Sequence, residues 1–549
     1  MSMKKTFFAA GCALLITTIL WAADAKLSKA ELKALKKSQP HFQTSDRCFA
    51  CHNNLFTASG ENVSIGLDWR ASMMANSSRD PYWQASVRRE SMEHPESQKA
   101  IEHECSICHM PMANYEARLQ GKEGEVFSHL PVTANTDLAA DGVSCSLCHQ
   151  ISKDKLGTRE SLVGGFVIDT TKPKGEKVVY GPYKVDDGHS RIMRTSSGGW
   201  RPNEAEHIRS SELCATCHTL ITKTLGPGGK ELGSFPEQMP YQEWLHSDFA
   251  NNGGMNQGTA RSCQNCHMPE VKDVAITRVL GETRETLGRH TFTGANFFMQ
   301  RMLNKYRGEL GVWALPQELE AGANRTVAYL QEQAARVSIP SVEIRAGRLE
   351  AIINVQNLGG HKFPTGYPSR RTWLHVTVKD NAGKTVFESG ALNNDGSITG
   401  NDNDADALKY EPHYLQITSP DQVQIYEAII VDPNNVLTTG LLNAAKYVKD
   451  NRLLPRGFNK VTADAEVATV GDAMNDSDFT GDGDHIRYSF NFGNAQGPFH
   501  VTAELLYQPT AYRWANNLRK FDAFEPKRFV GYYDSMAAGT AVVVARAER

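Results

Sequence analysis

Cys48-Phe-Ala-Cys51-His52 is the first of five Cys-x-x-Cys-His segments in this chain of 549 residues. The other four begin at Cys105, Cys145, Cys214 and Cys263. In such a segment both thiols form thioethers with the vinyl groups of a haem, and the histidine ligates the iron. The pattern predicts five covalent c-type haems. Their attachment residues are Cys48, Cys51, Cys105, Cys108, Cys145, Cys148, Cys214, Cys217, Cys263 and Cys266, and their proximal iron ligands are His52, His109, His149, His218 and His267.

Two other uses of paired cysteines fit this chain less well. Zinc sites do not need a histidine after every second cysteine, and an odd number of pairs suits four-cysteine sites poorly. A redox dithiol needs one pair in a thioredoxin-like fold rather than five. The five segments also use every one of the 11 cysteines except Cys12, so we expect no disulfide framework.

The N-terminus has the features of an export signal. Lys4 and Lys5 precede an apolar run from Phe7 to Trp21, and Ala23-Asp24-Ala25 follows as a cleavage site. This predicts a signal peptide over residues 1–25 that contains Cys12, with an uncleaved anchor or a lipidated Cys12 as less favoured alternatives. We expect a periplasmic protein, with an outer-membrane-associated or extracellular location as the alternative.

The distribution of motifs and apolar residues predicts three further segments and an α+β, multidomain fold class. The density of motifs predicts a loop-rich haem domain over 26–296, with each motif beginning a short helix and with no sheets. Apolar spacings of three and four from Phe298 to Ala334 predict a helical connector over 297–337, broken near Pro316. Alternating, β-branched runs such as Leu349-Glu-Ala-Ile-Ile-Asn-Val predict an antiparallel β-sandwich over 338–549.

The sixth coordination position of each iron separates an electron-transfer haem from one that binds substrate. Histidines in or near the haem region outnumber the five positions to be filled: His41, His94, His103, His129, His189, His207, His246, His290 and His361. Their contexts favour His103, His129, His189, His290 and His361 as distal ligands. His361 lies between Gly359 and Gly366, in a stiff loop that could reach back from the β domain to a haem. An ordinary hairpin turn is the alternative for that loop.

The segment from Asp141 to Gln150, the Cys214-Ala-Thr-Cys217-His218-Thr pattern and two Cys-His-Met-Pro repeats resemble multihaem cytochromes of the c-554 type. These share their haem packing with octahaem hydroxylamine oxidoreductases and pentahaem nitrite reductases. The resemblance covers roughly residues 40 to 300. The β domain resembles C-terminal portions of exported bacterial multihaem cytochromes.

Two departures from that family concern the iron sites. The family often has Trp-x-x-Ser-x-His with the histidine as a distal ligand, whereas this chain has Trp69-Arg-Ala-Ser72-Met73-Met74. Met74 is therefore a candidate distal ligand, or a side chain packed against a porphyrin. The catalytic Cys-x-x-Cys-Lys of pentahaem nitrite reductases is absent from the sequence, which argues against that activity.

Two acidic loops in the predicted β domain are candidate calcium sites. One contains Asp402, Asp404 and Asp406, and the other runs from Asp476 to Asp484. Alternating carboxylates suit calcium, but neither loop is a complete EF-hand, and solvated acidic turns are the alternative.

These patterns favour an electron-transfer protein over a catalyst. We expect an exported pentahaem cytochrome that exchanges electrons with redox protein partners, as a homo-oligomer or in a larger redox assembly. Two alternatives stay open: a haem oxidoreductase acting on a small nitrogen or sulfur compound at one open haem, and a subunit of an extracellular cytochrome filament. The net charge of −3 favours neither nucleic acid nor membrane binding, and no stretch after the signal reaches transmembrane length.

Overall fold

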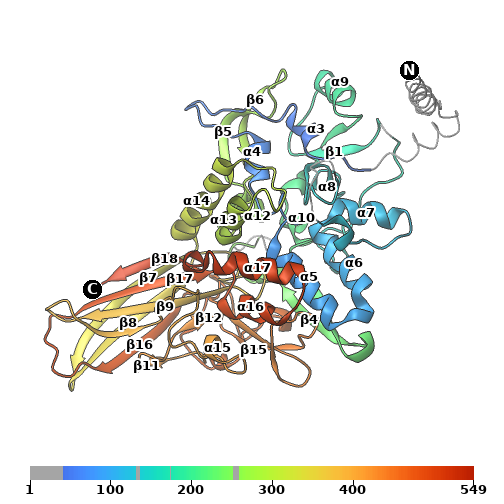
Figure 1. Cartoon of the computed structure of the whole chain (residues 1–549). Coiled ribbons are helices and arrows are strands. Elements are labelled where there is room, and N and C mark those ends of the chain that lie inside the picture. The colour runs from blue at the N-terminus through green and yellow to red at the C-terminus, as the bar shows by residue number, and fades with distance from the viewer. Residues whose placement is uncertain (1–40, 131–136, 174, 251–258) are drawn as a thin grey trace, which may run out of the picture. The chain divides into compact units, whose positions relative to one another are not determined.

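The computed structural model describes residues 41–130, 137–173, 175–250 and 259–549 (Figure 1). Residues 43–549 form one compact unit. The predicted signal peptide and Cys12 lie outside the described residues. Within the described ranges, no helix is both long enough and apolar enough to cross a membrane.

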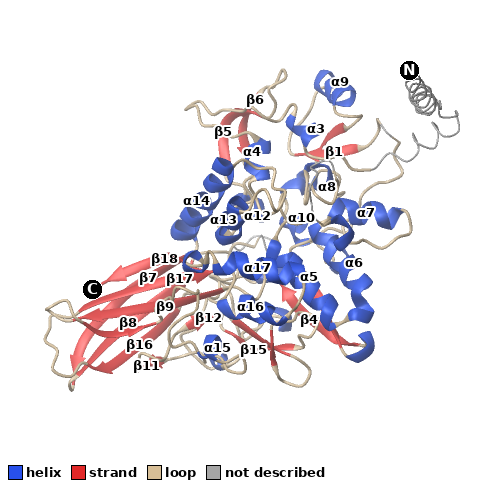
Figure 2. Ribbon diagram, in the orientation of Figure 1, coloured by secondary structure: helices blue, strands red, loops and turns tan. Residues whose placement is uncertain are grey.

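Long strands gather in the second half of the chain (Figure 2). One sheet has the order β10 (Thr385–Ser389), β9 (Arg371–Lys379), β17 (His500–Gln508) and β18 (Val542–Glu548), with β12 (Ile425–Tyr426) beside β9. A second has the order β11 (Gln416–Ile417), β16 (Asp484–Asn491), β8 (Arg348–Asn357) and β7 (Ala335–Arg345). A third, smaller sheet contains β14 (Leu437–Thr438), β13 (Ala428–Val431) and β15 (Lys446–Asp450). Neighbouring strands run antiparallel, apart from the β11–β16 pair.

The two larger sheets share one apolar core. Along β8 every second residue is buried, from Leu349 to Val355, as expected for a strand with one face inward. Phe387 of β10 stacks on Phe490 of β16 with ring centroids 4.3 Å apart. Since these strands belong to different sheets, the sheets pack face to face.

Two helices follow the last motif, where the apolar spacing predicts them. Helix α13 (Phe297–Lys305) buries Phe297, Phe298 and Met302, and α14 begins at Pro316 and ends at Gln333. Helix α14 packs against α13, β18 and β7, and also against α4 (Ile65–Arg70). The α14–α4 contact includes a hydrogen bond of 2.6 Å from Arg70 Nε to Glu318 Oε2. The connector thus joins the strands to the motif-bearing half.

Short helices carry the motifs in the first half (Figure 1). The motifs lie on or beside α3 (Asp46–Phe49), α6 (Gln98–His109), α8 (Cys145–Cys148), α10 (Ser211–Ala215) and α12 (Cys263–His267). Between them are α5 (Pro81–Glu93), α7 (Pro111–Leu119), α9 (Asp187–Ser196) and α11 (Pro240–Leu245). In both Cys-His-Met-Pro segments the helix ends at the histidine, before Pro111 and Pro269. Proline thus follows each of these helices closely, as its missing N–H favours.

The structure differs from the sequence-based expectation in three places. The first half contains three two-stranded sheets: β1 (Val178–Gly181) with β2 (Arg201–Glu204), β3 (Leu220–Leu225) with β4 (Glu231–Gln238), and β5 (Glu270–Ala275) with β6 (Thr283–Gly288). Only the Cys145 and Cys263 motifs begin their helices. The Cys48 and Cys214 motifs start near the ends of α3 and α10, and the Cys105 motif ends the longer helix α6, where good helix formers precede it. The predicted β-sandwich region also contains three helices: α15 (Asp402–Ala405), α16 (Tyr512–Asn516) and α17 (Phe524–Asp534). The boundaries at 296/297 and 337/338 stay predictions, since residues 43–549 form a single unit.

Replacing Arg371 by methionine will destabilise the β half. Arg371 and Asp404 form a bidentate ion pair with N–O distances of 2.9 and 2.8 Å, and both side chains are at most 3% exposed. The variant leaves the Asp404 carboxylate buried without its cation, which typically costs about 3–5 kcal/mol. Denaturant unfolding of the haem-loaded protein measures the change. Arg519→Met removes an exposed pair with Asp534 and should cost less than about 1 kcal/mol; equal losses would contradict the prediction.

Candidate functional site

All five motifs open into the same cavity. It has a volume of about 2140 Å³, and its lining includes all ten motif cysteines and all five motif histidines. Aromatic and aliphatic side chains such as Phe49, Trp69 and Trp83 supply much of the remaining wall. A cavity of this size with apolar walls fits large flat apolar groups, and its thiols lie where such groups would be attached.

Four motif histidines have their rings oriented by the backbone. The Nδ1 atoms of His52, His109, His149 and His267 lie 2.6, 2.9, 2.6 and 2.6 Å from the carbonyl oxygens of Ile276, Ser77, Tyr180 and Thr293. A histidine that donates Nδ1–H to a carbonyl keeps the lone pair on Nε2 free for a metal. These carbonyl partners are a feature that the motif itself does not reveal.

Burial keeps these imidazoles neutral. It lowers the pKa of His109 to about 4, and the carbonyl of Ser77 opposes this only in part. It also lowers the pKa of His267 to about 4, with His361 as the next cause. A neutral imidazole is the form that binds iron, so both rings are ready to act as ligands at neutral pH.

Contacts between thiols show which motifs are neighbours. Cys48 raises the pKa of the Cys145 thiol, Cys217 that of Cys108 and Cys263 that of Cys214, so the two side chains of each pair lie close together. Burial raises the pKa of the Cys148 thiol to about 12, and the charge of nearby Cys217 contributes to this rise. The first motif therefore lies beside the third, while the fourth adjoins the second, third and fifth. The spatial order differs from the order in sequence.

Two predicted distal ligands lie opposite a motif histidine. The rings of His290 and His149 have centroids 6.4 Å apart and planes 20° apart, and those of His361 and His267 are 6.1 Å and 9° apart. Two imidazoles on one iron, with metal–nitrogen bonds of about 2 Å, have ring centres about 6 Å apart. The Nδ1 atoms of His290 and His361 face carbonyl oxygens at 3.1 and 2.9 Å. Each pair is spaced to hold one iron.

Met74 and His189 also line the cavity, but the structure shows no ligand geometry for either. Asp186 is hydrogen-bonded to Nδ1 of His189, and the carbonyl of Leu280 lies 2.7 Å from Nε2. Both partners raise the pKa of this imidazole, the Leu280 carbonyl most. His189 is thus a double hydrogen-bond donor here and would have to release Leu280 to bind iron through Nε2.

His103 and His129 are not among the lining residues of the described cavity. Nδ1 of His103 accepts a hydrogen bond of 2.9 Å from the backbone N–H of Gly124, which leaves the ring proton on Nε2. His129 lies 3.5 Å from Asp137, and that hydrogen bond raises the pKa of the imidazole. Neither ring is arranged as an iron ligand in this structure.

Three other histidines of the first half use Nε2 for hydrogen bonds. The partners of His94, His207 and His246 are Asn443 Oδ1 at 3.0 Å, the Ile151 carbonyl at 2.9 Å and the Asp464 N–H at 3.3 Å. These contacts hold loops together. Context in the sequence does not distinguish such rings from iron ligands.

Polar side chains from two segments line the cavity near His218 and were not predicted from the sequence. Burial lowers the pKa of His218, and the charge of Arg370 lowers it further. Asp80, also near Arg370, has its pKa raised by burial to about 6. Tyr82 and Tyr367 are hydrogen-bonded to each other, with ring centroids 5.7 Å apart. No motif links these positions in the sequence.

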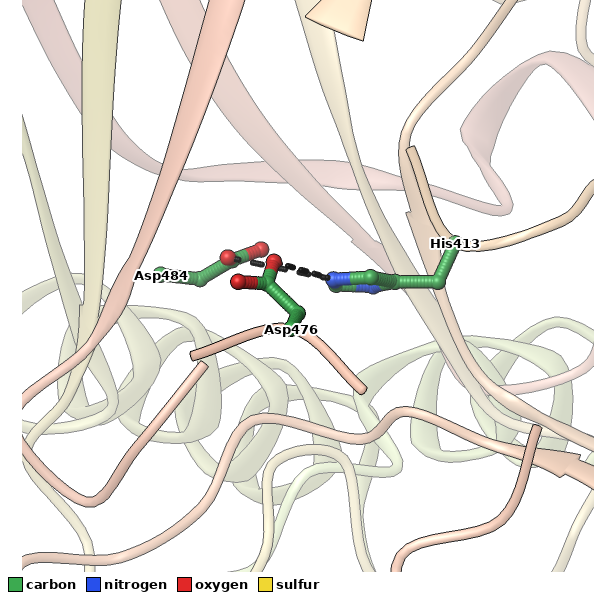
Figure 3. Close-up of side chains that lie close together, drawn as sticks. All are labelled: His413, Asp476 and Asp484. Carbon is green, nitrogen blue, oxygen red and sulfur yellow. Dashed lines mark hydrogen bonds and ion pairs between the residues drawn. The ribbon is translucent and has the colours of Figure 1, made fainter. Parts of the chain in front are cut away.

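His413 meets Asp476 and Asp484 inside the β half (Figure 3). Nε2 of His413 lies 3.1 Å from Asp476 Oδ2 and 3.9 Å from Asp484 Oδ1. The amide nitrogens of Gln424 and Asn451 lie 3.0 and 3.1 Å from Nδ1, which therefore accepts. Their amide oxygens accept from backbone N–H groups, so this orientation is fixed. The ring proton is on Nε2 and points at the carboxylates, which is the arrangement of a hydrogen-bonded core rather than of a metal ligand.

The predicted calcium sites gain no support from these contacts. In the first loop, both oxygens of Asp404 are occupied by Arg371. In the second, Asp476 and Asp484 face His413, and Asp484 also accepts a hydrogen bond of 2.7 Å from Tyr426. Calcium prefers six to eight oxygen ligands. Calcium in the β half stays a prediction.

Comparisons with known proteins give one likeness in structure. No family model and no curated protein matches the sequence. A matching solved structure is a penta-heme cytochrome c552 from Thermochromatium tepidum, with 16% identity and a TM-score of 0.52. The match covers 93% of this chain and 100% of that chain. At this identity the likeness concerns the fold alone: the chain shares the fold of a penta-heme cytochrome over nearly its whole length.

Proposed function

We propose that this chain is an exported pentahaem c-type cytochrome that carries electrons between redox proteins in the periplasm. The observation that carries the proposal is the single cavity into which all five Cys-x-x-Cys-His motifs open. The shared fold with a penta-heme cytochrome supports it. A common cavity brings the five attachment points close enough for electrons to pass between neighbours.

The residues of this chain would hold and orient the groups. The ten motif thiols would form the thioethers, and the five motif histidines would bind iron through Nε2, with ring orientation set by backbone carbonyls. His290 and His361 would occupy the sixth coordination position of the third and fifth irons. When bound, each haem supplies a one-electron iron centre. Ligand type, burial and nearby charge would then tune each potential.

Neighbouring thiols support a branched route. The first and third positions adjoin, and the fourth adjoins the second, third and fifth. Electrons entering at the first position would reach the fourth through the third, and could leave through the second or the fifth. The fourth position would thus be the junction of the chain.

A second candidate function is catalysis at the fourth iron. Arg370, Asp80 and the Tyr82–Tyr367 pair line the cavity near His218. A cation with phenols and a carboxyl group could bind a small anionic nitrogen or sulfur compound and donate protons to it.

Haem content and spin state of the purified protein test the proposal. We expect five haems per chain, matching the five motifs, and low-spin ferric EPR signals from the two haems that His290 and His361 would ligate. Fewer than five haems would contradict the pentahaem assignment. A high-spin signal from one haem, together with binding of nitrite or hydroxylamine to it, would favour the second candidate.

A further inference from the structure

The loop that carries His361 connects β8 to β9 and is anchored at both ends. Nδ2 of Asn357 donates to the carbonyl of His361 at 2.7 Å and to that of Leu453 at 3.0 Å. Phe363 and Leu453 exchange two backbone hydrogen bonds of 2.9 Å. His361 thus stands between two fixed points of the β half and faces His267 of the fifth motif.

Lys362 links the ring of His361 to a group of buried charges. Its carbonyl lies 2.9 Å from Nδ1 of His361, and its backbone N–H donates to Glu243 Oε2 at 3.1 Å. Its ammonium group lies 2.7 Å from Asp450 Oδ2. The residue that orients the ring is therefore held at its main chain and at the end of its side chain.

Four charges balance each other in this group, which contains Lys362, Asp450, Arg452 and Glu243. Arg452 lies 2.8 Å from Asp450 and 2.9 Å from Glu243. The four side chains are exposed by 0%, 1%, 9% and 0%, in that order. Buried ion pairs add little stability over apolar side chains of equal volume, but they restrict how the segments they join can move.

Glu243 connects this group to the fifth motif. It belongs to α11, and its neighbour Trp244 donates from Nε1 to the carbonyl of Arg261 at 2.9 Å, two residues before Cys263. The buried charges therefore join the strand β15, the His361 loop and the helix that contacts the fifth motif. Movement of one segment relative to the others would break at least one charged contact.

Resting on the proposed function, we propose that Lys362, with Glu243, Asp450 and Arg452, positions His361 as the distal ligand of the fifth iron. Lys362 acts through His361 and touches neither the iron nor the porphyrin. Its carbonyl sets the rotation of the imidazole about its own axis, and its ammonium group keeps that carbonyl in place. A hydrogen-bonded partner of this kind typically changes the metal affinity of its histidine by roughly 10- to 100-fold.

Lys362→Met in the haem-loaded protein tests this role. The methionine keeps an unbranched side chain and leaves Asp450 paired with Arg452. We expect five haems per chain, a new high-spin ferric signal, and carbon monoxide binding to ferrous protein at up to one site per chain. Added imidazole should restore the low-spin spectrum. Glu243→Gln is a second variant. It removes the negative charge on α11, the helix that contacts the fifth motif, and should produce the same high-spin signal.

Lys449→Met is the matched control, because Lys449 forms another buried pair in β15, at 3.0 Å from Glu427, without contacting the His361 loop. It should cost similar stability and leave the spectrum unchanged. His361→Ala removes the ligand itself, so it gives the largest spectral change that loss of positioning could cause. If His361→Ala changes one haem but Lys362→Met and Glu243→Gln do not, the positioning role is wrong and the ligand assignment stands. If Lys449→Met has the same spectral effect as Lys362→Met, the positioning role is also wrong. A protein without bound haem would overturn the proposed function itself.

Discussion

Made without haem, this chain will not form the structure of its first half. The cavity of about 2140 Å³ lies where a domain of this length would have its core. Without haem, the apolar side chains that line this cavity would face water, and each large one left uncovered costs about 1.5–3 kcal/mol. Domains are stable by only about 5–15 kcal/mol, so exposing several such side chains would exceed the whole stability. Near-UV circular dichroism and limited proteolysis of protein produced without haem attachment measure the outcome.

Without haem, the two halves of the chain should differ in how fast a protease cleaves them. We expect rapid proteolysis between residues 43 and 296, whereas surviving fragments should come from the strands after Ala335, whose core is filled by side chains such as Leu349 and Ile353. The haem-loaded protein, digested alongside, is the control. A double variant, Cys105→Ala with Cys108→Ala, should lose one haem and part of the resistance. Equal resistance of haem-free and haem-loaded protein would contradict the prediction.

Local chemistry explains which parts of the fold were predictable. The alternation of Leu349, Ala351, Ile353 and Val355 is a property of one segment, and β8 lies there. Proline at position 316 begins α14 for an equally local reason. The hairpin of β3 and β4 was missed although Pro227-Gly228-Gly229 marks its turn, with positive φ at both glycines. The density of haem motifs predicts loops and short helices there, so it conflicts with the turn signal.

The distal sites depend on contacts between segments distant in the sequence. His189 and His290 look equally suitable in the sequence, but a carbonyl of the β5–β6 loop occupies Nε2 of one, while the other faces His149. A motif identifies the proximal histidine because covalent attachment of haem fixes the spacing between its cysteines and that histidine. A distal ligand is identified only by which ring the fold brings opposite it, and no local pattern encodes that distance.

Replacing either distal histidine should free the sixth coordination position of one iron and leave the other haems unchanged. His290→Ala and His361→Ala each remove the ring whose centroid lies 6.4 or 6.1 Å from a motif histidine. Each variant should keep five haems, because the thioethers do not depend on the distal ligand. Each should also convert one haem from low-spin to high-spin and let the ferrous protein bind about one carbon monoxide per chain. The potential of that haem should rise, since a second imidazole stabilises ferric iron and axial ligands set potentials over about 0.8 V.

The two variants differ in which part of the route they disturb. In the proposed route, His290 serves the third position, which lies between the first and the fourth, so its loss should slow electron transfer through the chain. His361 serves the fifth position, an end of the branched route, so its loss should leave transfer from the first to the fourth position unchanged. Flash reduction followed by optical spectroscopy can separate these cases. His500→Ala, which removes an exposed histidine of β17, is the control and should change neither spectrum nor rate. Spectra unchanged from the unsubstituted protein in both distal variants would show that these histidines are not iron ligands, and equal slowing in both would contradict the branched order.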